Sequence, residues 1–115
     1  MAIKLYEEAL LIDREIGDVR GESQDLANLG GAYDDLGDLR KALGCCDEAL
    51  ILKLKIGDKH GEGKSLMNSA LMLNKLGKRA QAIARAEAAL NIFEAIEDPN
   101  AAKARAALAE WRGHT

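Results

Sequence analysis

The sequence repeats itself every 40 residues, and this feature constrains the fold more than any other. Three segments align without a gap at that offset, namely 2–18, 42–58 and 82–98. Ala, Leu, Ile and Asp recur at fixed positions in all three, and the intervening segments 19–41 and 59–81 also align with each other. The chain is therefore predicted to consist of equivalent units that stack in sequence and bury a continuous core.

Each 40-residue unit is predicted to be a pair of α-helices. Ala and Leu dominate the composition, and these residues lose little rotamer freedom in a helix. Gly37 and Gly77 are expected to end the first helix of each unit, because a left-handed residue is easiest for Gly. An Asp at 18, 58 or 98 is expected to cap the helix that follows, with Pro99 at the first position of the last helix. The expected helices are 2–16, 19–36, 39–56, 59–76, 79–97 and 99–111.

Small residues recur where the two helices of a unit should approach closely. Gly30 and its counterpart Ala70 lie on the first helices, and Ala42 and Ala82 lie on the second helices. Tyr33 and Leu73 should fill the space one turn later. The two cysteines, at 45 and 46, point about 100° apart on a helix, so they should not bridge each other and are interpreted as small buried residues.

The pattern of these positions resembles the tetratricopeptide repeat. The residues that carry the resemblance are Leu26, Leu29, Gly30, Tyr33, Gly37, Ala42 and Ala49. The 40-residue unit and the segment Ile16-Gly17-Asp18, followed by Gly21-Glu22, are similar to the long-repeat subclass that includes kinesin light chains. The usual aromatic residues of both helices are replaced by Leu26 and Cys46, and Leu54 replaces the late proline. The resemblance implies an all-α, helical-hairpin solenoid (an αα superhelix) of about six helices.

The expected organisation is one domain, 1–115, that contains a half repeat and a capping helix besides two full repeats. Its parts are the half repeat 2–18, the repeats 19–58 and 59–98, and the C-terminal helix 99–112. The first helix has no hairpin partner, so Tyr6, Leu10 and Ile12 should be partly uncovered. Either the chain is a fragment of a longer array, or it forms a homo-oligomer through this N-terminal helix. In the last helix, Lys103, Arg105 and Arg112 should face solvent, and Trp111 either packs on the preceding pair or is an exposed anchor.

Composition argues against several classes of function. There are 16 basic and 19 acidic residues, a net charge of −3, and no basic stripe of the kind that binds nucleic acid. The longest apolar runs, such as residues 9–12, are far shorter than the roughly 20 residues of a membrane span. No secretory signal is evident, so a cytoplasmic location is expected. Neither His60 nor His114 has companions at metal spacing, and no nucleophile has a placed base, so no enzyme activity and no cofactor is expected.

A binding surface is the remaining prediction. The resemblance implies that the first helix of each unit lines a concave groove, and an Asn amide at one register in each unit can bond to an extended peptide. The alternative is that these amides only bond neighbouring helices. The predicted peptide-binding residues are Gln24, Asn28, Asp35, Lys64, Asn68, Leu71 and Lys75. We expect a non-catalytic module that binds a protein or peptide, as a scaffold or as the sensor part of a larger regulator. The alternatives are a structural, self-associating module and a ligand-sensing accessory domain of an enzyme or transcription regulator.

Overall fold

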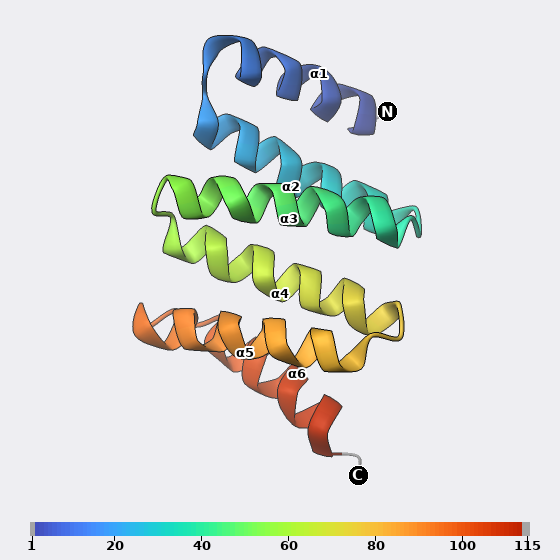
Figure 1. Cartoon of the computed structure of the whole chain (residues 1–115), viewed down its shortest axis with the longest axis vertical. Helices are drawn as coiled ribbons and strands as arrows, with labels where there is room; N and C mark the ends of the chain where they lie inside the picture. The colour runs from blue at the N-terminus through green and yellow to red at the C-terminus, as the bar shows by residue number, and fades with distance from the viewer. Residues whose placement is uncertain (1, 114–115) are drawn as a thin grey trace. The chain divides into compact units, whose positions relative to one another are not determined.

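A computed structural model describes residues 2–113, which form six α-helices and no strand (Figure 1). The helices are α1 (Ala2–Ile16), α2 (Val19–Asp35), α3 (Leu39–Lys55), α4 (Lys59–Lys75), α5 (Arg79–Ala95) and α6 (Ala101–Gly113). The helices α2 to α5 each contain 17 residues, and α4 and α5 begin 40 residues after α2 and α3. The predicted all-α fold of repeated helical hairpins is therefore confirmed.

The helices group into two compact units, and the chain passes from one to the other at the predicted repeat boundary. The first unit ends at Asp58 and the second begins at Lys59. In the first unit α2 packs on both α1 and α3, and in the second unit α5 packs on both α4 and α6. Within each unit, consecutive helices are joined by tight turns (Figure 1).

The same turn closes successive helices. After α2, Gly37 adopts a φ of +81° and its N–H donates to the carbonyl of Asp34, while the N–H of Asp38 donates to the carbonyl of Tyr33. This arrangement, which needs a left-handed residue, satisfies carbonyls that the helix end leaves without partners. Gly77 has the same conformation, as predicted, and Glu97 occupies the corresponding place after α5 with a φ of +56°.

Among the predicted helix caps, Asp18 is confirmed at the start of α2, whereas the start of the last helix departs from the prediction. The carboxylate of Asp18 accepts the N–H of Gly21 at 2.9 Å, whereas Lys78 provides no side-chain cap for α5. The helix α6 begins at Ala101, so the prediction that Pro99 is its first residue was wrong. The reason is local: Asp98 accepts the N–H of Asn100 at 2.9 Å, which holds residues 99 and 100 in a turn before the helix.

Small residues permit close helix packing in both units, as predicted. A Cβ atom at Gly30 would lie 3.0 Å from Sγ of Cys46 and 3.3 Å from the carbonyl oxygen of Ala42. The alanines at 42, 70 and 82 are fully buried. Cys45 and Cys46 do not form a disulfide; Cys46 is buried against α2, while Cys45 is only half-buried. In the first unit the core also contains Leu10, Leu26 and Leu29.

The two end helices differ in how they are covered. On α1, Ile12 is exposed as predicted, but the expectation for Leu10 was wrong, because this residue packs into the core that α1 shares with α2. On α6, Trp111 is buried, which excludes its role as an exposed anchor, and Lys103, Arg105 and Arg112 are exposed as predicted. Across residues 2–113, no helix has the length and apolar character needed to span a bilayer.

Candidate functional site

The second unit contains a pocket of about 250 Å³ between α4, the end of α5 and α6. The apolar part of its lining consists of Met67, Leu71, Phe93 and Ala107. Met67 and Phe93 are buried, while Leu71 is 43% exposed and so presents its side chain at the mouth. Pockets for drug-sized ligands have volumes of about 300–1,000 Å³, so this one has room for one or two side chains.

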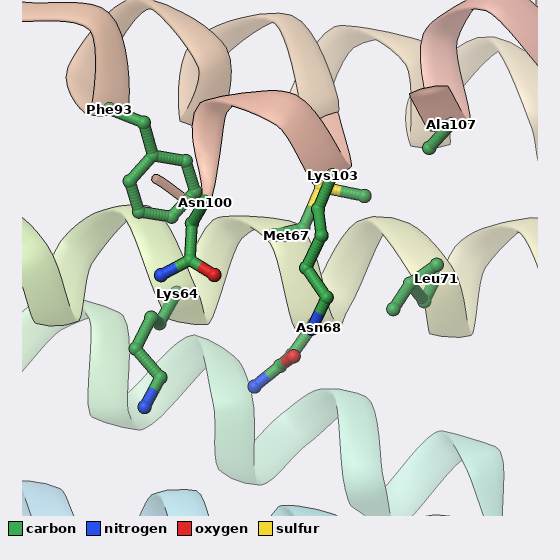
Figure 2. Close-up of a pocket in the computed structure, with 8 residues that line it drawn as sticks. All are labelled: Lys64, Met67, Asn68, Leu71, Phe93, Asn100, Lys103 and Ala107. Atoms are coloured by element: carbon green, nitrogen blue, oxygen red, sulfur yellow. The ribbon is translucent and has the colours of Figure 1, made fainter. Parts of the chain in front are cut away.

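Four polar residues complete the lining of this pocket, two from each side. Lys64 and Asn68 are one turn apart on α4, Asn100 lies in the turn before α6, and Lys103 lies in the first turn of α6. Figure 2 shows Phe93 and Asn100 at one end of the pocket and Leu71 and Ala107 at the other. Among the described residues, neither Lys64 nor Lys103 makes an ion pair. The pocket therefore combines an apolar floor with two ammonium groups and two amides.

A set of polar contacts fixes the turn that carries Asn100. The Asp98 carboxylate bonds both the backbone N–H of Asn100 and Nδ1 of His60, which lies at the start of α4. The N–H of Asn100 and the imidazole of His60 hold the pKa of Asp98 below its usual value. The ring of His60 also lies 6.5 Å from the ring of Phe93, centroid to centroid. These contacts link the two sides of the pocket at its Phe93 end.

Three of the seven predicted peptide-binding residues, Lys64, Asn68 and Leu71, line this pocket together. Lys75 is the last residue of α4 and does not line the pocket. The other three predicted residues belong to α2 in the first unit. There Gln24 and Asn28 are one turn apart, with Nε2 of Gln24 at 3.4 Å from Oδ1 of Asn28, and Asp35 is exposed at the end of the helix. This contact joins residues of one helix, so it is not the bond between neighbouring helices that the alternative expects.

Sequence reasoning did not identify Phe93, Asn100, Lys103 and Ala107 as members of the site. Phe93 stands in the register of Asp13 and Lys53, so the repeat gave no signal for an aromatic residue there. Asn100 belongs to the turn that the prediction had placed inside a helix. The predicted binding residues of α4, Lys64, Asn68 and Leu71, could have indicated where the site lies. A helix that packs beside them adds its own residues to the same surface.

Two other kinds of site, a metal site and a reactive serine, were sought among residues 2–113. No group of three or more His, Cys, Asp or Glu side chains is arranged to hold a metal ion in this range. The buried hydroxyls of Ser23 and Ser69 donate to the carbonyls of Arg20 and Leu66 within their own helices. Ser69 also accepts a hydrogen bond from Arg85 at 3.0 Å, so it contributes to the packing of α4 against α5.

Comparison with known proteins adds no family assignment. No model of a known protein family matches this chain, and no curated protein matches it significantly.

Proposed function

We propose that this chain is a tetratricopeptide-like, non-catalytic module that binds a protein or peptide through the pocket of the second unit. One observation carries the proposal. Lys64 and Lys103, which make no ion pair among the described residues, lie beside the apolar floor of the pocket. An apolar side chain would enter the pocket, and carboxylates next to it would interact with the two ammonium groups. The volume of about 250 Å³ favours part of a peptide over a whole cofactor.

The amides give the site a way to hold a peptide backbone. Asn68 is exposed beside Lys64, and each Asn side chain has two donors and an acceptor. The amide of Asn68 would form hydrogen bonds with main-chain groups of the peptide, whatever its side chains. The two lysines would select for acidic side chains. A cytoplasmic scaffold, or the sensor part of a larger regulator, is the role that fits such a site.

The test uses fluorescence anisotropy of a labelled peptide that has one large apolar residue between acidic residues. We expect Lys64→Ala and Lys103→Ala each to weaken binding several-fold, and Asn68→Ala to weaken it as well. Lys78→Ala is the matched control, because Lys78 is an exposed lysine that lies outside the pocket lining and should leave affinity unchanged.

A second peptide, with lysines in place of its acidic residues, tests the electrostatic part of the proposal. It should bind weakly or not at all, and amide chemical-shift changes for the acidic peptide should centre on α4 and the start of α6. Equal binding of both peptides, or shift changes confined to the first unit, would refute the proposal.

A further inference from the structure

The first helix presents an apolar stripe that no other helix covers in residues 2–113. The α1 stripe comprises Ala2, Leu5, Ala9, Ile12 and Ile16, spaced alternately by three and four residues, which places them on one face. Leu5, Ile12 and Ile16 are 65%, 57% and 70% exposed. These three large aliphatic side chains expose apolar area on one face, and its burial against another helix would be favourable.

The internal repeat indicates what kind of element covers such a stripe. Forty residues later, the same register holds Cys45 and Leu52 on α3, and both are half-buried against the core to which α2 contributes. α3 packs on α2, and α5 packs on α4, so each of these second helices has a first helix against it. The α1 stripe is therefore shaped for a helix that packs as α2 packs on α3.

The last helix, α6, lacks the complementary partner, a second helix that follows it and packs on its other face. α6 occupies the register of a first helix, and it packs on α5, which precedes it in the chain. Its other face, the α6 stripe, consists of Ala106, Ala109 and Gly113, and all three are exposed. Their counterparts on α2 include Leu26 and Leu29, which are buried against the next helix.

Charge favours α6 over a second α1 as the occupant. α1 contains two basic and four acidic residues, a net charge of −2. α6 contains three basic residues and one acidic residue, a net charge of +2; Arg105 and Arg112 pair with Glu94 and Glu87 of α5, and Lys103 has no ion pair among the described residues. Two α1 helices face to face would repel each other, whereas α1 and α6 attract.

We propose that α6 of one copy packs on the α1 stripe of a second copy, so that the chain associates with itself head to tail. This contact completes a helical hairpin of the same kind as α2–α3 and α4–α5. It is heterologous, because different surfaces meet, and such a contact can join successive copies into an open chain or a ring. The proposal does not involve the pocket of the second unit and is independent of the function proposed above.

One residue of α6 opposes the contact. Glu110 stands in the register of Gly30 and Ala70, where the packed helix leaves little room, since a Cβ atom at Gly30 already lies 3.0 Å from Cys46. The interface is also a single helix pair, smaller than the roughly 1,200 Å² at the low end of stable interfaces. We therefore expect weak association, in the high micromolar range, that the substitution Glu110→Ala strengthens several-fold.

The test is the weight-average mass of the whole chain, measured by sedimentation velocity and light scattering from micromolar to near-millimolar concentration. We expect a mass that rises past that of two chains. Ile12→Glu on the α1 stripe and Ala109→Glu on the α6 stripe should each give a monomer. Leu11→Glu is the matched control, because Leu11 is 61% exposed on α1 but lies outside the stripe, and it should leave association unchanged.

Mixing the two monomeric variants gives the decisive result. Ile12→Glu keeps an intact α6, and Ala109→Glu keeps an intact α1, so the equimolar mixture should form pairs of two chains and nothing larger. Helix content by circular dichroism verifies that each variant folds. A constant monomer at all concentrations, a wild-type plateau at two chains, or an Ala109→Glu variant that still self-associates would each overturn the proposal, the last two in favour of α1 pairing with α1.

Discussion

Gly63 on α4 lies directly against the ring of Phe93 on α5. A Cβ atom at Gly63 would stand 2.5 Å from Cε1 and 2.9 Å from Cζ of that ring, and Phe93 is only 1% exposed. In the first unit the same two registers hold Ser23 and Lys53. The second unit thus replaces a polar pair with an aromatic ring and the one residue that leaves space for it, and this ring forms part of the pocket.

Replacing Gly63 with Ala should lower the stability of the protein, although Ala is the better helix former. The helix would gain about 1 kcal/mol from the substitution. Overpacking of a buried contact costs about 1–3 kcal/mol, because the ring of Phe93 must shift. We expect the free energy of unfolding to fall by about 1 kcal/mol in urea denaturation.

The matched control is Gly44→Ala on α3. A Cβ atom at Gly44 meets nothing within 4 Å, so only the helix preference changes and stability should rise by about 0.5–1 kcal/mol. If both alanine variants gain stability, the contact between Gly63 and Phe93 does not restrict the packing of this unit.

Replacing Lys78 with Asp should stabilise α5. Asp18 and Asp38 cap α2 and α3 with their carboxylates, whereas Lys78 makes no such bond at the start of α5. An Asp at this position should raise the free energy of unfolding by about 1 kcal/mol. Lys78→Ala removes the positive charge without supplying an acceptor, so the difference between the two variants measures the cap. Equal stability of the two variants would mean that the introduced carboxylate does not cap the helix.

The fold was predictable from the sequence because the same pattern of helix-forming, small and turn residues occurs in each repeat. Helix boundaries followed from Gly37 and Gly77, whose left-handed conformation is a local requirement of the chain. The exception, the start of α6, depended on a hydrogen bond between Asp98 and Asn100 that competes with the helix preference of Pro99.

The candidate site was predictable only in part. The register of α4 placed Lys64, Asn68 and Leu71 on one surface, and this follows from helical periodicity alone. Phe93 and Lys103 reach the same pocket from other helices, at positions where the repeated units differ from each other. A repeat predicts what its copies share, so a site built from their differences needs the three-dimensional structure.

Replacing Glu97 with Gly should stabilise the turn after α5. Glu97 has a φ of +56°, whereas glycines occupy the equivalent places at 17, 37, 57 and 77. A left-handed conformation costs a non-Gly residue about 1–2 kcal/mol, while the extra freedom of Gly in the unfolded chain costs about 0.4–1 kcal/mol. We expect a net gain of about 0.5–1 kcal/mol and a higher melting temperature. The reverse change, Gly57→Ala, serves as the control and should lower the melting temperature.

Asp25 should make the stability of the protein depend on pH. Burial, together with the neighbouring carboxyl groups of Asp13 and Asp18, raises the pKa of Asp25 to about 6. One oxygen of Asp13 is also buried without a hydrogen-bond partner among the described residues. Between the ordinary Asp pKa of about 3.9 and a pKa near 6, the folded state therefore binds more protons than the unfolded state. The free energy of unfolding should fall as the pH rises through this window and level off above it.

Asp25→Asn, which cannot ionise, should remove this slope and raise stability at neutral pH. Urea denaturation at a series of pH values measures the effect, with Asp35→Asn at the exposed end of α2 as the control that keeps the slope. An unchanged slope in Asp25→Asn would show that Asp25 is not the group that binds the extra proton in the folded state.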